Sequence, residues 1–294
     1  IVEAKLGQGA MGSVFRGRHT TAGNEVAIKV LHTHLVNQPV MLERFRREAR
    51  VAARLHHENL VGVLEVGQTS DGYQLIVLEL ARGPSLRQLM TEPFDAERIV
   101  GLVKPILRGL EHAHQAGLIH RDLKPDNVMV EHSADGTEIP RIVDFGIAVL
   151  RDPDESEQGK LTASGVIVGT PLYMAPEQAK GESFDHRIDL FALGVTVYEM
   201  LAGEPPFSGS AIEIAIANIN NDPPAIATKG VTADPVLEAF ARKLMARRPD
   251  QRFATARAAL DVLELVDDPE LAMLRMGRMD VAKARAVVEL PASK

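Results

Sequence analysis

Short apolar runs, separated by Gly-rich or polar turns, predict a small β-rich region over the first 80 residues. The pattern of β-forming residues predicts five strands, at 1–6, 15–18, 26–30, 60–66 and 73–80. Between the third and fourth strands, apolar residues recur at three-to-four spacing and predict a helix over 38–55. The first part of the chain is therefore expected to hold five strands and one helix.

Helical patterns dominate after residue 85. They predict a short helix at 85–90 and a long one at 96–115, which ends at Gly117. The run 190–201 is apolar on nearly all sides, so we expect a buried helix there. A polar hairpin is predicted between Val130 and Arg141. The chain as a whole is expected to be an α+β protein.

Composition sets broad limits on the function. The 294 residues include 45% hydrophobic and 25% charged residues, which is ordinary for a globular protein and enough for a substantial core. The net charge of −7 gives no electrostatic case for nucleic acid or a membrane surface as the main partner. The absence of Cys excludes disulfides and thiolate metal sites. Because the chain begins at Ile1 inside a predicted strand, we expect it to be part of a longer protein.

The loop at 120–127 gathers the reactive groups of the chain. It holds one imidazole, two cations, two carboxylates and a carboxamide between a predicted helix and an apolar run, where reactive groups are usually displayed. Asp122 and Asn127 suit an acid near a nucleophile and an amide oxygen on a metal ion. Asp144, directly after a predicted buried strand at 141–143, adds a second carboxylate that could bind a metal ion, on a Gly-containing turn.

These motifs carry a resemblance to a known family. H-R-D-L-K-P-D-N at 120–127 and D-F-G at 144–146 resemble the catalytic loop and metal-binding motif of protein kinases. G-x-G-x-x-G-x-V at 7–14, V-A-I-K at 26–29 and A-P-E at 175–177 follow the order of that family. The residues of these motifs are most similar to those of bacterial serine/threonine protein kinases of the eukaryotic, or Hanks, type.

The resemblance covers about residues 1–266 and implies a bilobal protein kinase fold. A small N-lobe of five antiparallel strands and one helix is expected at 1–80 and binds ATP. A larger, mainly helical C-lobe is expected at 81–266, with the catalytic loop and the activation segment. The tail at 267–294 is expected to be a helix or a linker, and no function is assigned to it.

The resemblance also implies catalytic roles. Asp122 is expected to accept the proton of the substrate hydroxyl. Lys124 would bridge this base and the transferred phosphoryl group, which favours Ser or Thr as the acceptor. Asn127 and Asp144 are expected to bind Mg²⁺, for which Mn²⁺ can substitute.

Lys29 is expected to hold the phosphates of ATP, oriented by Glu48 on the apolar face of the predicted helix. Two alternatives remain open from the residues alone. Lys29 ends an apolar strand and also reads as a surface lysine. Glu48 also reads as a solvated residue, with Arg46 or Arg47 making the ionic contact of this helix.

The expected nucleotide site extends beyond the phosphates. Its residues by resemblance are Leu6, Gly7, Gly9, Gly12, Val14, Ala27, Lys29, Leu78, Glu79, Ala81, Met129 and Asp144. The glycines let backbone N–H groups approach phosphate oxygens. Glu79 and Ala81, in the segment that corresponds to the hinge (residues 79–84), would offer backbone groups to adenine. For the apolar members, plain core packing is the alternative.

The segment 144–177 corresponds to the activation segment of the family. Thr162 and Ser164 are candidate regulatory phosphorylation sites, because a phosphate there would satisfy the guanidinium of Arg121 with charge-assisted contacts. The alternative is an unmodified polar loop. Arg252 is expected to form a structural pair with Glu177.

The expected function is transfer of the γ-phosphoryl group of MgATP to Ser or Thr hydroxyls of proteins, with autophosphorylation of the activation loop. The alternatives are a pseudokinase-like scaffold and a small-molecule phosphotransferase. Expected partners are protein substrates and a second copy of the chain bound through the N-lobe, with neither nucleic acid nor a membrane segment. The expected location is the cytoplasm. One alternative within this expectation is that the chain is the intracellular domain of a membrane-anchored protein.

Overall fold

The computed structural model describes residues 1–9, 12–32, 39–145, 171–266 and 268–277. These residues form two compact units. The first comprises the described residues of 1–89 and 109–145, and the second those of 90–108 and 171–277. The lobe boundary expected between residues 80 and 81 stays a prediction.

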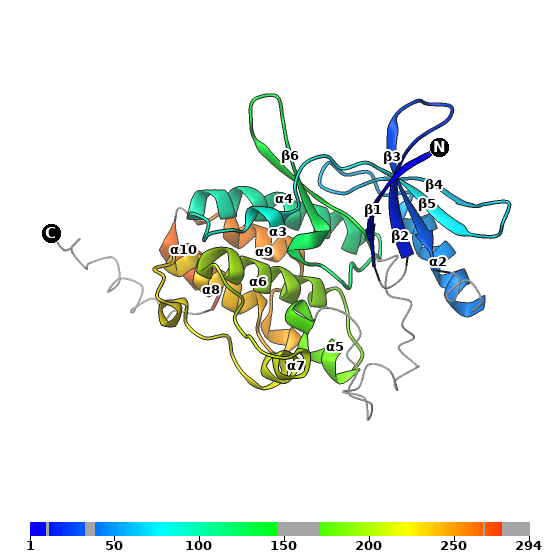
Figure 1. The fold of residues 1–294 in the computed structure, drawn as a ribbon. Coiled ribbons are helices and arrows are strands. Elements are labelled where there is room, and N and C mark those ends of the chain that lie inside the picture. The colour runs from blue at the N-terminus through cyan, green and yellow to red at the C-terminus, as the bar shows by residue number, and fades with distance from the viewer. Residues whose placement is uncertain (10–11, 33–38, 146–170, 267, 278–294) are drawn as a thin grey trace. The chain divides into compact units, whose positions relative to one another are not determined.

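An antiparallel sheet of five strands, in the order β1-β2-β3-β5-β4, forms the centre of the first unit (Figure 1). The strands are β1 (Val2–Gln8), β2 (Gly12–Arg18), β3 (Glu25–Leu31), β4 (Val63–Gln68) and β5 (Gln74–Glu79). Helix α2 (Pro39–Ala52) connects β3 to β4 in the chain. The predicted five strands and the predicted helix are thus confirmed in this part of the structure.

The two faces of this sheet carry different side chains. On one face Val26, Ile28 and Val77 form an apolar cluster, which is extended by Val30 and Leu75. Residues directly opposite each other on neighbouring strands share a face. The register pairs Lys29 with Val14 and Ile76, and Ala27 with Leu78, so these five residues lie on the other face. The sheet therefore gathers Lys29 and three of the predicted adenine-site residues on one surface.

The strand predicted at 60–66 begins only at Val63, for a visible reason. Residues 60 and 61 pair with Ile142 instead of with β5: Leu60 forms a parallel bridge to it, and the Val61 N–H donates to its carbonyl oxygen at 2.9 Å. Ile142 ends β7 (Glu138–Ile142), which forms an antiparallel hairpin with β6 (Val128–His132). The hairpin is thereby fixed to the chain that enters β4.

Two short helical elements complete the first unit. The helix predicted at 85–90 is α3 (Leu86–Leu89), and the 3-10 helix η1 (Pro125–Asn127) leads directly into β6. Because η1 is followed at once by a strand, the predicted catalytic loop at 120–127 leads directly into regular structure at its C-terminal end.

The second unit is mainly helical, as predicted for the larger part of the chain (Figure 1). Its elements are α4 (Ala96–Gln115, which continues into the first unit from Gly109), η2 (Pro171–Tyr173), α5 (Pro176–Lys180), α6 (Arg187–Ala202), α7 (Ala211–Asn220), η3 (Ile226–Lys229), α8 (Pro235–Leu244), η4 (Pro249–Gln251), α9 (Ala256–Leu263) and α10 (Pro269–Arg275). Helix α6 is buried from Ile188 to Ala202, which confirms the predicted buried helix. Among the helices that the structure describes, none has both the length and the apolar character needed to cross a bilayer.

Candidate active site

His120 anchors the start of the catalytic loop. Its side chain is fully buried, and its Nδ1 accepts a hydrogen bond from the backbone N–H of Asp122 at 3.3 Å. The proton therefore lies on Nε2, which donates to the carbonyl oxygen of Val143 at 2.9 Å. The imidazole also meets the ring of Phe145 edge-on, with 4.9 Å between centroids. One histidine thus connects the loop to the residues on both sides of Asp144.

Asp122 is oriented by two donors from its own loop. Lys124 Nζ lies 2.8 Å from Asp122 Oδ2, and Asn127 Nδ2 lies 3.3 Å from the same oxygen. Asn127 Nδ2 also donates to the carbonyl oxygen of Asp122 at 2.8 Å. The side chain of Asp122 keeps 35% of its surface exposed, so an incoming hydroxyl can reach it. The structure therefore brings together the three predicted loop residues.

Asp144 lies next to this loop and next to Lys29. The Val143 N–H donates to the carbonyl oxygen of Asn127 at 2.9 Å, which places the backbones before Asp144 and at the end of the loop side by side. Lys29 Nζ lies 3.0 Å from Asp144 Oδ1, and the Lys29 side chain is only 6% exposed. The alternative reading of Lys29 as a surface lysine is wrong, because this ammonium is buried and paired.

Glu48 has a different partner from the one expected. Its Oε1 lies 2.8 Å from Arg121 Nη1, whereas Lys29 pairs with Asp144. The Glu48 side chain is 19% exposed, so the alternative of a solvated glutamate is also wrong. A partly buried carboxylate needs a cation, and in this structure that cation comes from the catalytic loop. The expected Glu48–Lys29 pair is therefore corrected to Glu48–Arg121 for this arrangement of the chain.

Two residues of the site have unusual backbone angles. Arg121 and Asp144, with φ of 68° and 61°, are the non-glycine residues with positive φ among those described. A left-handed conformation costs a residue with a Cβ about 1–2 kcal/mol. In Arg121 it accompanies the contact with Glu48, and in Asp144 the contact with Lys29. Strain at two neighbouring functional positions is typical of sites where side-chain direction matters more than local stability.

The donor set fits a magnesium–nucleotide complex. The Asn127 amide nitrogen is turned toward Asp122, so the amide oxygen is the atom left to coordinate a cation. Asp144 adds carboxylate oxygens, and oxygen is the ligand type that Mg²⁺ prefers. The buried ammonium of Lys29, on the same carboxylate, suits an anionic phosphate.

The three glycines of the N-terminal loop differ in their surroundings. A Cβ built on Gly7 or Gly9 would meet no atom within 4 Å, which leaves the space that a phosphate needs. A Cβ on Gly12 would lie 2.1 Å from the carbonyl oxygen of Val30 on the paired strand. Gly12 is therefore required for strand pairing, and the open approach to a ligand lies at Gly7 and Gly9.

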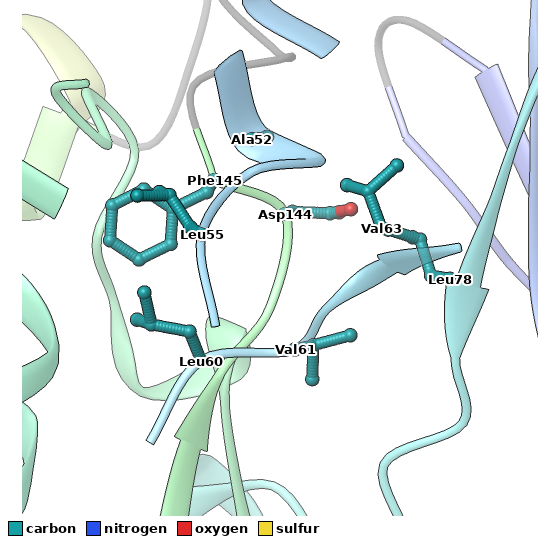
Figure 2. Close-up of a pocket in the computed structure, with 8 residues that line it drawn as sticks. All are labelled: Ala52, Leu55, Leu60, Val61, Val63, Leu78, Asp144 and Phe145. Atoms are coloured by element: carbon teal, nitrogen blue, oxygen red, sulfur yellow. The ribbon is translucent and has the colours of Figure 1, made fainter. Parts of the chain in front are cut away.

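A small cavity shares Leu78 and Asp144 with the predicted nucleotide site. It is lined by Ala52, Leu55, Leu60, Val61, Val63, Leu78, Asp144 and Phe145 (Figure 2). Asp144 and Phe145 project to opposite sides of the chain, and Phe145 faces Leu55 and Leu60 (Figure 2). Leu78, a member of the predicted nucleotide site, is part of this lining.

The remaining nucleotide-site residues lie at the edges of the same unit. Leu6 is 54% exposed on β1. Glu79 ends β5, and Ala81 follows it. Met129 on β6 bridges to Ser85 after the hinge and pairs across the hairpin with Arg141. Their contact with adenine stays a prediction.

The sequence did not predict two polar contacts: those of Asn218 in the second unit, and that of Arg141 with Glu79 at the start of the hinge. Asn218 on α7 is 2% exposed, and its Nδ2 donates to the carbonyl oxygens of Pro171 at 3.1 Å and Met174 at 3.2 Å. Arg141 on β7 contacts Glu79 and was read only as a strand residue. The available signal was the same in both cases: a polar residue within an otherwise apolar stretch needs a buried partner.

The predicted structural pair of Glu177 and Arg252 is confirmed. Arg252 Nη1 and Nη2 donate to the two carboxylate oxygens at 2.6 and 2.8 Å, and the side chains are 5% and 0% exposed for Glu177 and Arg252. Backbone carbonyl oxygens of Ala246 and Arg187 accept further hydrogen bonds from the guanidinium. Thr162 and Ser164, the candidate phosphorylation sites, lie outside the described residues.

Comparison with known proteins agrees with these geometric observations. The family model described as the protein kinase domain matches residues 1–262. The serine/threonine-protein kinase pkn3 of Myxococcus xanthus is 37% identical over 99% of this chain and 54% of its own length. PknB of Mycobacterium tuberculosis is 37% identical over 85% of this chain and 40% of its own length.

A solved structure gives the same result for the fold. The crystal structure of the Mycobacterium tuberculosis PknI kinase domain covers 90% of this chain and 95% of its own, with a TM-score of 0.69 and 28% sequence identity. The chain spans 54% of the length of pkn3 and 40% of the length of PknB, about half of each relative.

Proposed function

The chain belongs to the protein kinase family, among bacterial serine/threonine kinases of the Hanks type, and we propose that it transfers the γ-phosphoryl group of MgATP to Ser and Thr hydroxyls of proteins. The observation that carries this proposal is the cluster of Asp122, Lys124, Asn127, Asp144 and Lys29 within one unit. Phosphoryl transfer depends mainly on positioning and on charge neutralisation, and these five side chains supply both.

Asp122 acts on the nucleophile in this proposal. Its carboxylate accepts the proton of the substrate hydroxyl, while Lys124 and Asn127 hold one of its oxygens in place. Lys124 also faces the transferred group and offsets its negative charge. A short Ser or Thr side chain suits this arrangement, because the base and the ammonium are only 2.8 Å apart and must both reach the reacting centre.

Asn127, Asp144 and Lys29 serve the nucleotide. Asn127 and Asp144 would hold Mg²⁺, or Mn²⁺ in its place, and the ion when bound neutralises charge on the phosphate oxygens. Lys29 would exchange part of its contact with Asp144 for the phosphates, which keeps the buried ammonium paired throughout. The open space at Gly7 and Gly9 supports their place beside the phosphates, and the hinge backbone at Glu79 and Ala81 would bind adenine.

The Glu48–Arg121 contact suggests how the site is regulated. A phosphate on Thr162 or Ser164, added by autophosphorylation, would compete with Glu48 for the Arg121 guanidinium. The released Glu48 would then reach Lys29, as the resemblance implies. The chain described here, with Glu48 on Arg121, corresponds in this proposal to the arrangement before phosphorylation.

Two other functions are less well supported. A pseudokinase-like scaffold would dispense with one of the charged groups, and Lys29, Asp122 and Asp144 are all present. A small-molecule phosphotransferase would not need a segment closed by A-P-E, whose Glu177 is held by Arg252 in a buried pair. We place the domain in the cytoplasm, where ATP is available, with protein substrates and a second copy bound through the N-lobe as proposed partners.

One comparison tests this function. Phosphate transfer from labelled ATP to a generic basic protein is measured for the chain and for Asp122→Asn, which keeps the size of the side chain and removes the base. We expect a loss of about 10²–10⁴-fold in kcat. Asp126→Asn is the matched control, because Asp126 lies in the same loop with its side chain 53% exposed, and it should change kcat less than about twofold. Equal transfer by the chain and by Asp122→Asn contradicts the proposed role.

A further inference from the structure

The hinge, residues 79–84, is held at its first residue by a guanidinium from another strand. Arg141 Nη2 on β7 contacts Glu79 Oε2, and the same nitrogen donates to the carbonyl oxygen of Leu60 at 3.0 Å. The Gly62 N–H donates to Glu79 Oε2 at 3.3 Å. The side chain of Arg141 is 17% exposed and that of Glu79 is 43% exposed, so the guanidinium is the more buried partner of this contact. Arg141 therefore links the end of β5 to the chain entering β4.

Farther along the hinge, Arg82 is held by a carboxylate from the same hairpin. Glu131 Oε1 on β6 accepts a hydrogen bond from the backbone N–H of Arg82 at 2.7 Å. The same oxygen lies 3.7 Å from Arg141 Nη1, so one guanidinium serves both Glu79 and Glu131. The side chain of Arg82 is turned toward Glu25 on β3, at 3.0 Å. The four residues from Glu79 to Arg82 are thus fixed at both ends by the β6–β7 hairpin.

Backbone contacts bring the rest of the hinge onto the same hairpin. The Val130 N–H donates to the carbonyl oxygen of Pro84 at 2.9 Å. Gly83 has φ of 106°, and a Cβ there would lie 2.2 Å from the carbonyl oxygen of Val130. Gly83 is therefore required both for its conformation and for its close approach to β6. This closeness leaves the hinge little freedom to shift away from the hairpin.

The charges of this cluster depend on one another. Partial burial works to raise the pKa of Glu79, but the hydrogen bonds from Arg141 and from the Gly62 N–H outweigh it, so the pKa lies below its ordinary value. Removing the Arg141 guanidinium would leave Glu79 and Glu131 without the cation that they share. The two carboxylates, both held by this one guanidinium, would then repel each other, and we expect the hinge backbone to move.

We propose that Arg141 and Glu131 are positioning residues that fix the hinge backbone for the adenine ring and so set the affinity for the nucleotide. This inference rests on the proposed function, in which the backbone groups of Glu79 and Ala81 bind adenine. A binding segment that is already fixed loses less conformational entropy when the ligand arrives. Neither side chain touches the reacting atoms, so their effect falls on binding and not on the chemical step.

The test separates adenine binding from catalysis. The variants are Arg141→Met, Arg141→Lys, Glu131→Leu and Glu131→Gln. KM for ATP and kcat are measured with a generic basic protein, and the Kd of adenosine, which lacks phosphates, is measured by calorimetry. Arg248→Met is the matched control, because Arg248 is an arginine paired with Asp250 at 2.6 Å whose side chain is 69% exposed.

We expect Arg141→Met and Glu131→Leu to raise KM for ATP and the Kd of adenosine by the same factor, about tenfold, with kcat at saturating ATP within about twofold. Glu131→Gln keeps an acceptor for the Arg82 N–H and should restore most of the affinity, and Arg141→Lys should lie between wild type and Arg141→Met. Arg248→Met should match wild type. Thermal unfolding identifies any variant that does not fold. If the Arg141 variants do not fold, the adenosine affinities of Glu131→Gln and Glu131→Leu are compared with each other and decide the inference.

Three outcomes overturn the proposal. The first is a loss of kcat with KM and the adenosine Kd unchanged, which would place these residues in catalysis. The second is tighter binding or higher activity in Arg141→Met, which would make the cluster a restraint on the hinge. The third is equal adenosine affinity for all variants. A wild-type chain that binds adenosine but transfers no phosphate refutes the proposed function alone, and the adenosine affinities still decide the inference.

Discussion

At the scale of single residues, two carboxylates of the candidate site take their cations from different segments: Glu48 contacts Arg121, and Asp144 contacts Lys29. Lys29, Glu48, Asp122, Asn127 and Asp144 were all identified from motifs. The partners of Lys29 and Glu48 depend on which of several charged groups lies closest in space, and residue types cannot decide this. Arg121 contacts Glu48 from a left-handed backbone conformation, which no sequence pattern of the loop predicts.

The buried pair of Glu177 and Arg252 predicts a large effect on stability. Glu177→Gln leaves the guanidinium without the carboxylate to which it donates twice, and we expect a loss of about 3–5 kcal/mol in the free energy of unfolding. Arg257→Gln is the control, because Arg257 and Asp261 form an exposed pair at 2.7 Å, and it should cost less than about 1 kcal/mol. Urea unfolding measures both. Equal losses in the two variants contradict the argument from burial.

Glu79 predicts a dependence of stability on pH. Because its pKa is lowered in the folded chain, its ionised form contributes stability above the ordinary glutamate pKa of about 4.3. This contribution is lost as the pH falls through the lowered value. We therefore expect Glu79→Gln to lower Tm at pH 7 and the difference from wild type to disappear toward pH 3. Tm measured by circular dichroism at pH 7, 5, 4 and 3 checks this, and a difference that does not change with pH contradicts it.

At the scale of elements, the sequence was most accurate where one pattern is long. The predicted helix 96–115 matches α4 at both ends, although Pro105 lies inside it. The helix predicted at 38–55 is three residues shorter at its C-terminus, where α2 ends at Ala52. The strand predicted from residue 60 begins at Val63, because residues 60 and 61 pair with Ile142, more than 75 positions away. Local alternation gives no information about such a distant partner.

The glycines of the N-terminal loop predict two different effects. Gly12→Ala would force a Cβ to 2.1 Å from the Val30 carbonyl oxygen, so β2 and β3 must separate locally. We expect it to lower the free energy of unfolding by about 1–3 kcal/mol, as overpacking does. Gly9→Ala meets no atom within 4 Å, so it should leave Tm within about one degree and raise KM for ATP. Urea unfolding and steady-state kinetics of both variants check this, and similar stability for the two contradicts it.

At the scale of the whole molecule, the order of the motifs predicted the function far better than composition and charge did. Charge and composition excluded disulfides and weakened the case for nucleic acid, but many proteins share them. The motifs from Gly7 to Glu177 follow one order along the chain, and this order is what the family model over 1–262 also recognises. What remained hidden was the network between Arg141, Glu131 and the hinge, because its members come from separate segments of moderate polarity.

The last prediction concerns how phosphate changes the contact between Glu48 and Arg121. If a phosphate on Thr162 or Ser164 displaces Glu48 from Arg121, phosphatase treatment should lower kcat/KM by about fivefold or more. The double variant Thr162→Ala and Ser164→Ala should show the same low activity, with or without phosphatase. Thr228→Ala is the control, because this exposed hydroxyl bonds only to the Ala225 carbonyl oxygen in the described contacts.

Glu48→Gln distinguishes this mechanism from a general need for phosphate. An uncharged glutamine binds the Arg121 guanidinium more weakly than a carboxylate does, so the guanidinium is released more easily. The same glutamine also pairs poorly with the Lys29 ammonium. Glu48→Gln should therefore have low activity that phosphatase barely changes. The variant has lost the ion pair with Arg121 proposed for the unphosphorylated chain and also the ion pair with Lys29 proposed for the phosphorylated chain. Mass spectrometry of the active enzyme identifies the modified residue. Full activity of the chain with Thr162 and Ser164 both unmodified contradicts the exchange of Glu48 between Arg121 and Lys29.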